Sequence, residues 1–233
     1  MINIQNTADC PKPSLVLCLY GLGKSGKTTL ATTAPKPLVL DGENGVKGLR
    51  TSAISVPYVA IRTWKDIQEC YEAFKDNKDY ETIIIDPLGA FMDALIDDVA
   101  GPSGMTLQKW GIAIEKFKKF VRAWTLTGKH VIFVAHDTFT PDDGVQLRSI
   151  QLPGKELPKV FRNMMDIVGY YAVENNGKRT LQLQPNMKID AGTRFNCFPP
   201  IMEVPKDDRE FITKMIATIH ASYEPAKIEA PKV

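Results

Sequence analysis

The sequence predicts an α/β fold with a mostly parallel central sheet and helices on both faces. Short apolar runs at 15–20, 37–40, 80–86 and 129–137 alternate with segments whose apolar residues have helical spacing. Later in the chain, two strand-like segments joined by an Asn-Asn-Gly turn predict a C-terminal β-hairpin extension. A length of 233 residues and a hydrophobic content of 44% suit one such domain with a sizeable core.

A glycine-rich motif follows the first apolar run. It consists of Gly21, Leu22, Gly23, Lys24, Ser25, Gly26, Lys27 and Thr28, fits G-x-x-x-x-G-K-[ST] at every fixed position, and continues as a helix at Thr29. In such a loop the backbone N–H groups bind phosphate, the lysine reaches the β- and γ-phosphates, and the Thr28 hydroxyl binds Mg²⁺. The motif therefore predicts a nucleoside triphosphate and Mg²⁺ as ligands. Lys24 takes a position that is more often glycine, and its charge can lie over the γ-phosphate or point to water.

Carboxylates follow two of the predicted strands. The run 37–40 ends at Asp41-Gly42-Glu43, and ligands bind at the carboxyl edge of open α/β sheets, so Glu43 could polarise a water for attack on the γ-phosphate. The same segment also fits a plain polar turn, and spacing alone favours neither interpretation. The run 80–86 ends in Asp86, the pattern of a Walker B strand, whose carboxylate would hold Mg²⁺ through water, opposite Thr28.

The strand predicted at 129–137 ends in His136 and Asp137. If this strand lies beside the phosphate-binding loop, His136 reaches the γ-phosphate and can report its presence. The alternative is a strand-end histidine whose ring is satisfied by a neighbouring carboxylate. Residues 138–158 have no sustained period and contain several prolines and glycines, so we expect a long loop there.

Basic residues gather in and after this predicted loop. They are Arg148, Lys155, Lys159 and Arg162, with Phe161 among them. Cations for phosphates and an aromatic ring for a base suit single-stranded nucleic acid, so these four basic residues are the candidate DNA contacts. The acidic pair Asp142 and Asp143 weakens this patch, and a net charge of +2 does not by itself demand a nucleic-acid partner.

Periodicity predicts the remaining elements. Helices are expected at 63–74, 90–99, 106–124 and 211–219, a short strand at 54–56, and the hairpin strands at 166–173 and 178–184. The lysines along 106–124 are typical of a solvated helix face. The Pro-, Ala- and Lys-rich end of the chain predicts a disordered tail.

Several classes of protein are not indicated. The four cysteines form no C-x-x-C pair, and with the three histidines they give no metal-ligand spacing, so we expect neither a zinc site nor a disulfide framework. No apolar run approaches the roughly 18 residues of a membrane span, and the polar N-terminus has no signal-peptide core. We therefore expect a cytoplasmic protein with no membrane partner.

Four motifs together resemble the RecA-like core ATPases, and most closely the small phage-type ATP-binding proteins described as single-strand annealing proteins related to RecA recombinases. They are the P-loop ending Gly26-Lys27-Thr28, then Asp41-Gly42-Glu43, Ile83-Ile84-Ile85-Asp86 and Val134-Ala135-His136-Asp137. The resemblance covers residues 15–194. It implies ATP as the nucleotide and a RecA-like ATPase domain at 15–222, between an N-terminal arm at 1–14 and the tail at 223–233.

The resemblance also implies roles for single residues. Glu43 becomes the base that activates water, and 129–137 becomes a sensor strand between the Walker A and Walker B strands, with His136 where recombinases often have glutamine. The segments 97–106 and 138–157 match the loops that line a DNA channel. Such cores bind ATP between the subunits of a ring or filament, and Arg194, or in second place Lys188, matches the cation that a neighbouring subunit contributes.

From this resemblance we expect a slow, DNA-stimulated, Mg²⁺-dependent ATPase that binds single-stranded DNA and promotes recombination or strand annealing. Annealing is favoured over strand exchange, because no extra DNA-binding domain or polymerisation motif is evident. The resemblance also implies a phage origin and a single-strand-binding protein as a partner. Two alternatives remain: a small-molecule P-loop kinase, although no arginine-rich lid is evident, and a RecA-like ATP switch that acts on protein partners without DNA.

Overall fold

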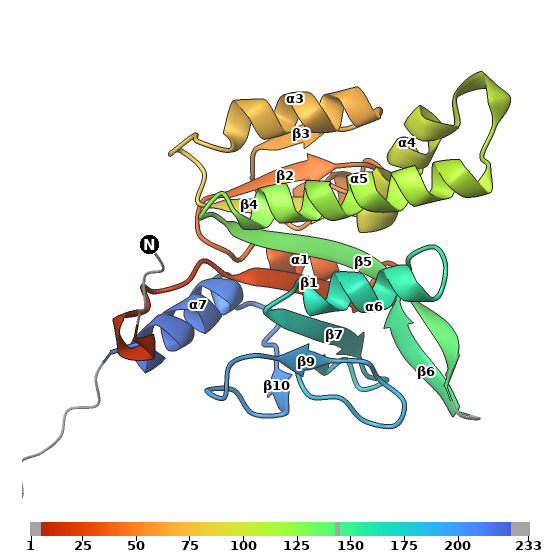
Figure 1. Ribbon diagram of the computed structural model, residues 1–233. Helices are drawn as coiled ribbons and strands as arrows, with labels where there is room; N and C mark the ends of the chain where they lie inside the picture. Colours follow the sequence, from red (N-terminus) through yellow and green to blue (C-terminus); the bar gives the residue numbers. More distant parts are fainter. Residues whose placement is uncertain (1–5, 143–144, 225–233) are drawn as a thin grey trace, which may run out of the picture.

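A central β-sheet organises the chain (Figure 1). The computed structural model describes residues 6–142 and 145–224. Its strands are β1 Val16–Gly21, β2 Pro37–Asp41, β3 Tyr58–Ala60, β4 Thr82–Asp86, β5 His130–Asp142, β6 Val145–Ile150, β7 Ile167–Val173, β8 Arg179–Gln182, β9 Gly192–Thr193 and β10 Ile201–Glu203. In the order β10-β8-β7-β1-β5-β4-β2-β3, the six strands from β7 to β3 are parallel, whereas β8 and β10 are antiparallel to their neighbours. The predicted mostly parallel sheet is confirmed.

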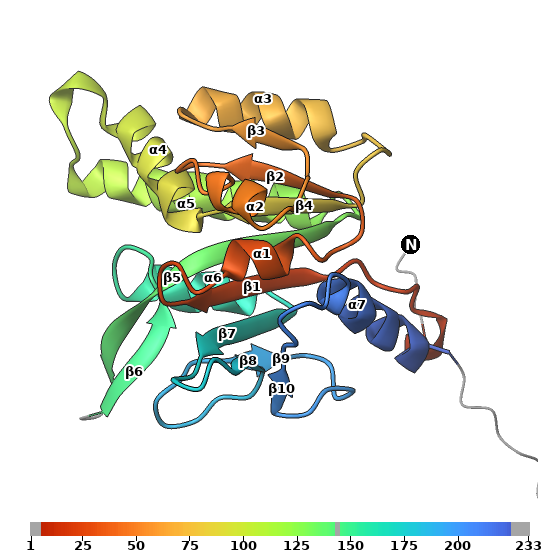
Figure 2. The same cartoon turned by 180° about the vertical axis from the view of Figure 1, so that it is seen from behind.

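Helices cover both faces of this sheet, as predicted (Figures 1 and 2). They are α1 Lys27–Ala31, α2 Lys47–Thr51, α3 Trp64–Phe74, α4 Leu88–Ala100, α5 Leu107–Thr125, α6 Glu156–Asn163 and α7 Phe211–Ser222, with 3₁₀ turns at Thr7–Asp9 and Gly101–Ser103. Alternation along β1 shows the two layers: Cys18 packs in the core under α3 to α6, and Leu19 packs in the core under α1 and α7. Both side chains are fully buried, so the apolar run is continuous.

The position of β5 brings the predicted site together. This strand pairs with β1 on one side, where Gly21 lies opposite His136, and with β4 on the other. The sheet therefore places β5 between β1 and β4, which is the position that the resemblance implied for a sensor strand. Because the strands are parallel, their carboxyl ends meet at one edge, which brings the P-loop, Asp86 and His136 to the same side of the molecule.

Two sequence predictions are wrong. Residues 54–56 are not a strand: β3 begins after Pro57, whose carbonyl already accepts a hydrogen bond from Val39 N (3.1 Å). Residues 138–158 are not a long loop, because β5 continues to Asp142 and pairs antiparallel with β6, and α6 begins at Glu156. The sequence held a signal for this hairpin in Asp143-Gly144, which precedes the alternating run 145–150.

The C-terminal part follows the predicted hairpin closely. Strands β7 and β8 pair antiparallel, with Tyr170 opposite Gln182, and the connecting turn is closed by a hydrogen bond from Gly177 N to Glu174 O (2.8 Å).

Helix α7 ends at Ser222, and the predicted arm and tail lie partly outside the described residues, which leave out 1–5 and 225–233. Among the described helices, none is long and apolar enough to cross a membrane.

Candidate functional site

The P-loop requires unusual, positive-φ backbone conformations at three positions, Gly21, Lys24 and Gly26. Gly21 has φ +152°, and a Cβ atom there would lie 2.3 Å from the Tyr171 carbonyl oxygen, so no larger residue fits. Lys24 has φ +61°, in the left-handed region, which accounts for the glycine that usually occupies this position. The Lys24 side chain is exposed. These conformations bend the chain from β1 into α1 within five residues.

Lys27 is buried beneath this loop, with 5% of its surface exposed. Its ammonium group donates hydrogen bonds to Gly21 O (2.8 Å) and Leu22 O (2.7 Å). Burial lowers the pKa of Lys27, and the charges of Asp86 and Asp137 oppose that shift. The Ser25 hydroxyl oxygen is buried and has no hydrogen-bond partner among the described residues. An unpartnered hydroxyl and a buried cation in one glycine-rich loop fit an anionic oxygen as ligand.

Asp86 ends β4 beside the start of α1. Its Oδ2 accepts a hydrogen bond from Thr28 Oγ1 at 2.5 Å. Burial, together with the nearby charges of Asp41 and Glu43, raises the pKa of Asp86 to about 6, although the Thr28 hydrogen bond and Lys27 act in the other direction. A hydroxyl and a carboxylate side by side are the protein ligands that Mg²⁺ takes in sites completed by phosphate and water. The pair therefore fits the predicted metal site.

The two carboxylates after β2 have different environments. Asp41 is buried, and its carboxylate accepts hydrogen bonds from the backbone N–H groups of Glu43, Gly45 and Val46 at 2.9 to 3.4 Å. Asp41 thus fixes the backbone of the segment 42–46 that follows β2. Glu43 is exposed at the same edge of the sheet, close enough for its charge to raise the pKa of Asp86. An exposed carboxylate near the metal pair is free to reach a water molecule.

His136 lies directly across from the P-loop. A Cβ atom built on Gly23 would lie 3.7 Å from its Cε1, so the imidazole and the loop are in contact range. The next residue, Asp137, forms an ion pair with Arg148 of β6 (2.5 Å), and the guanidinium group lies 4.4 Å from the centre of the Phe139 ring. Phe139 is 53% exposed. Sequence reasoning missed Phe139, because its position beside Arg148 depends on the unpredicted hairpin.

The predicted DNA contacts divide into two kinds. Arg148 is held by Asp137, and Arg162 forms an ion pair with Asp190 (2.7 Å) and donates to Ala191 O (3.1 Å). Lys155 and Lys159 are exposed, and Lys159 lies 3.4 Å from Glu156. The two lysines are therefore available to a ligand, whereas the two arginines have structural partners.

The candidate cations for a neighbouring subunit lie at different edges. Arg194 bonds Asp166 (3.2 Å) and Asn163 O (2.8 Å), and Asp166 in turn accepts from Val16 N at the amino end of β1. Arg194 therefore lies at the edge opposite its own P-loop. Lys188 is exposed in the segment between β8 and β9, and its carbonyl accepts from Arg148 N (2.8 Å), beside the β5–β6 hairpin.

In the described part of the chain, no group of three or more His, Cys, Asp or Glu side chains could hold a metal. Magnesium in nucleotide sites needs no such cage, because substrate phosphates and water complete its shell. The Thr28–Asp86 pair is thus the place in the described chain that suits the ion.

Comparison with known proteins places this geometry in a family. Residues 14–195 match the family model described as "AAA domain". The SPbeta prophage-derived uncharacterized protein YorG of Bacillus subtilis (strain 168) is 31% identical over 81 residues, which is 33% of this chain. The match spans only about a quarter (24%) of that relative's length.

Proposed function

This chain belongs to the AAA domain family of P-loop NTPases, and we propose that it is a Mg²⁺-dependent ATPase of the RecA-like type that binds single-stranded DNA and promotes recombination or annealing. The observation that carries the proposal is the continuity of β5. One strand presents His136 to the P-loop and, three residues further, the exposed Phe139 to solvent. A nucleotide site and a base-stacking surface would thus share one structural element.

The hydrolytic mechanism follows from the residues at the carboxyl edge. Lys27 would exchange the carbonyl oxygens of Gly21 and Leu22 for the β- and γ-phosphate oxygens. Thr28 and Asp86 would hold Mg²⁺, which when bound neutralises charge on the phosphates. Glu43 would orient the attacking water, and Arg194 or Lys188 of a neighbouring subunit would stabilise the charge that develops on the γ-phosphate.

Support for DNA binding comes from the surface around the hairpin. The β5–β6 hairpin and the connection between α4 and α5 both project from the side of the molecule that carries the P-loop (Figures 1 and 2). Phe139 offers an exposed ring for stacking, and Lys155 and Lys159 offer cations for phosphates. The prophage origin of one relative agrees with the phage origin that the resemblance implied for this chain.

Glu43→Gln is expected to retain ATP while hydrolysis falls by roughly 10²- to 10⁴-fold, the usual contribution of a general base. The amide keeps the size of the side chain but cannot accept the proton of the attacking water. Turnover is measured by phosphate release, and ATP binding by isothermal titration. Unchanged turnover would remove Glu43 from the mechanism.

Single-stranded DNA is expected to stimulate ATP hydrolysis, and Phe139→Ala is expected to weaken DNA binding by about 5- to 150-fold, because stacking on one base contributes about 1–3 kcal/mol. The double variant Lys155→Ala/Lys159→Ala should also lose one to two phosphate contacts. Each lost contact should reduce the slope of the logarithm of the binding constant against the logarithm of the salt concentration by about 0.7. Anisotropy of a labelled oligothymidylate at several salt concentrations measures both effects. Lys65→Ala, a remote and exposed lysine on α3, is the matched control.

If DNA changes neither the ATPase rate nor the binding signal, the DNA part of the proposal fails. The ATP switch on protein partners then becomes the better interpretation of the same nucleotide site. Arg148→Ala is unsuitable for this test, because it would leave the largely buried Asp137 carboxylate without its ion pair.

A further inference from the structure

The side chain of Glu43 is not held by the residues around it. Its carboxylate is exposed and forms no hydrogen bond or ion pair within the described part of the chain. A group that orients a water molecule must nevertheless be placed to within about 0.5 Å, because a small displacement already slows the reaction. The backbone of the segment 42–46 therefore has to set the position of this carboxylate.

The first residue of this segment is fixed to the end of β4. Gly42 N donates a hydrogen bond to Asp86 O (2.8 Å). A Cβ atom at Gly42 would lie 2.7 Å from Ala90 Cβ, so the backbone packs directly against α4 and leaves no room for a side chain. The backbone immediately before Glu43 is therefore fixed relative to the Thr28–Asp86 pair.

Asn44, immediately after Glu43, has an unusual backbone conformation and a contact from another strand. Its φ of +61° lies in the left-handed region, which asparagine adopts more readily than most residues. Its Oδ1 accepts a hydrogen bond from Arg62 Nη2 (2.6 Å), and Nη1 of the same guanidinium group donates to Ile61 O (2.7 Å). One planar group thus joins the turn after β2 to the end of β3.

The backbone of Arg62 is itself held firmly. Its N–H group donates to Asp66 Oδ2 (2.8 Å), which also accepts from Thr63 N (2.8 Å) in the capping box that begins α3. Just before it, Ile61 N donates to Asp41 O (2.8 Å), so the end of β3 is bonded to β2. The arginine side chain therefore extends from a fixed point, the junction of β3 and α3.

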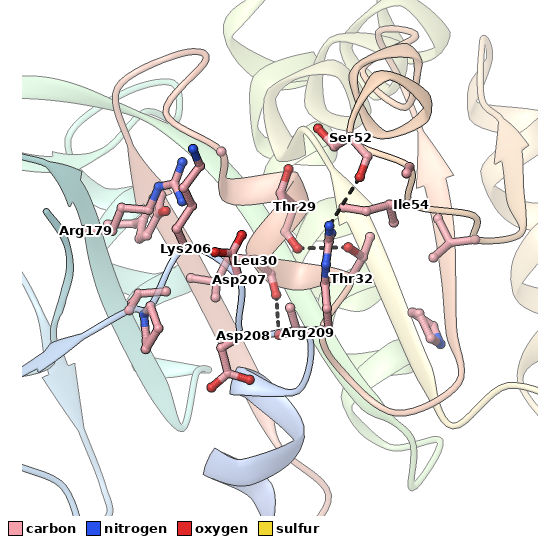
Figure 3. Close-up of a pocket in the computed structure, with 18 of the residues that line it drawn as sticks. Thr29, Leu30, Thr32, Ser52, Ile54, Arg179, Lys206, Asp207, Asp208 and Arg209 are labelled. Atoms are coloured by element: carbon pink, nitrogen blue, oxygen red, sulfur yellow. Dashed lines mark hydrogen bonds between the residues drawn. The ribbon is translucent and has the colours of Figure 1, made fainter. Parts of the chain in front are cut away.

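The connection between β2 and β3 is also tied at its far end. A cavity of about 670 Å³ lies there beside α1 (Figure 3). Its other walls come from parts of the chain that are far apart in sequence: the segments 52–56 and 204–209, and Arg179 of β8. Arg209 joins two of these walls by donating to Ser52 O (3.3 Å). The connection is thus restrained at both ends, and Arg62 restrains the end that carries Glu43.

We propose that Arg62 is a positioning residue for Glu43 and that it acts through Asn44. This inference rests on the proposed ATPase function, in which Glu43 orients the attacking water. Without the guanidinium group the turn keeps its contacts to Asp41 and Asp86 but loses the hydrogen bond at Asn44. Glu43 then spends less time where it can hold the water. ATP binding does not depend on this contact, because neither Arg62 nor Asn44 belongs to the P-loop.

Arg62→Ala is expected to lower kcat for ATP hydrolysis by about three- to tenfold, the effect of losing one hydrogen bond, while KM for ATP stays within about twofold. The fold should not change, because Arg62 contributes to the α3 cap through its backbone N–H group, which alanine retains. Arg50→Ala is the matched control. Arg50 is an exposed arginine of α2 whose side chain forms no hydrogen bond or ion pair with the described residues, and its variant should hydrolyse ATP at the wild-type rate.

Asn44→Gly tests the same contact from its other side. Glycine adopts the left-handed backbone conformation without strain but lacks the acceptor oxygen, so this variant should lose about as much kcat as Arg62→Ala. The double variant Arg62→Ala/Asn44→Gly should lose no more than either single variant, because both remove one hydrogen bond. If Arg62→Ala fails to fold, Asn44→Gly decides the question.

A second double variant tests whether Arg62 acts through Glu43. When Arg62→Ala is added to Glu43→Gln, kcat should fall no further, because no base is left to position. Single-turnover phosphate release resolves these slow rates, and circular dichroism checks the fold of each variant.

The outcomes separate this inference from the proposed function. An unchanged kcat in Arg62→Ala and Asn44→Gly, or a rise in KM alone, would overturn the positioning role. An equal further loss on adding Arg62→Ala to Glu43→Gln would overturn it as well, since Arg62 would then act independently of Glu43. If Glu43→Gln itself hydrolyses ATP at the wild-type rate, the proposed mechanism fails and the positioning role fails with it.

Discussion

Lys27→Ala is expected to reduce ATP hydrolysis by roughly 10²- to 10³-fold or more, the effect of removing one preorganised charge from a phosphoryl-transfer site. Lys27 supplies the buried ammonium group of the P-loop, and alanine cannot contact the β- and γ-phosphates. ATP affinity should fall as well, because the lysine binds the ground state. Phosphate release and ATP titration measure the two effects.

The nucleotide-free Lys27→Ala protein should keep its fold. The substitution removes the hydrogen bonds to Gly21 O and Leu22 O, which lowers the free energy of unfolding. It also removes a cation whose pKa is lowered by burial, which raises the free energy of unfolding, so the two effects oppose each other. Lys65→Ala, on the surface of α3, serves as the control and should leave hydrolysis unchanged. A Lys27→Ala variant that hydrolyses ATP at the wild-type rate would contradict the proposal that the P-loop is the site of hydrolysis.

Asp86→Asn is expected to abolish Mg²⁺-dependent hydrolysis while making the metal-free protein more stable at neutral pH. The pKa of Asp86 is raised from 3.8 to about 6, chiefly by burial, so ionisation costs the folded state up to roughly 3 kcal/mol. Between about pH 4 and pH 6 the folded state binds more protons than the unfolded state, so wild-type stability falls as pH rises. Asparagine removes that dependence.

Urea unfolding of the metal-free proteins at several pH values tests this prediction. The stability advantage of Asp86→Asn should be small near pH 4 and reach its full size above about pH 6. Asp98→Asn, which breaks an exposed ion pair with Lys116, is the control and should change stability by no more than about 1 kcal/mol. An advantage that is the same at every pH would show that Asp86 is not the cause.

The parts of the fold that the sequence predicted are those with a strong local pattern. The buried runs of β1, β2, β4 and the first part of β5 follow from continuous apolar residues, and α3 and α5 follow from their apolar spacing. The P-loop motif by itself predicts a strand before it and a helix after it, so its position at the end of β1 could be predicted without knowing any contact between distant residues. Asp86 was placed correctly at a strand end, because a parallel sheet aligns those ends. His136 lies opposite Gly21 as expected, but it is not at the end of its strand, because β5 continues to Asp142.

The parts that were missed depend on contacts between distant residues. Arg148 looked like a free cation in a loop, but it pairs with Asp137, eleven positions earlier, only because β5 turns back as β6. The cavity beside α1 is closed by segments 52–56 and 204–209, more than 140 positions apart. No local pattern relates such segments, so neither Arg179 nor the cavity could be identified before the fold was known.

The unbroken course of β5 has a mechanical consequence. Between residues 136 and 139 the strand spans about 10 Å, at roughly 3.3 Å for each residue, and it is hydrogen-bonded to β1 at one end and to β6 at the other. Because one continuous strand joins the two residues, we expect a displacement of His136 to be passed along the backbone to Phe139.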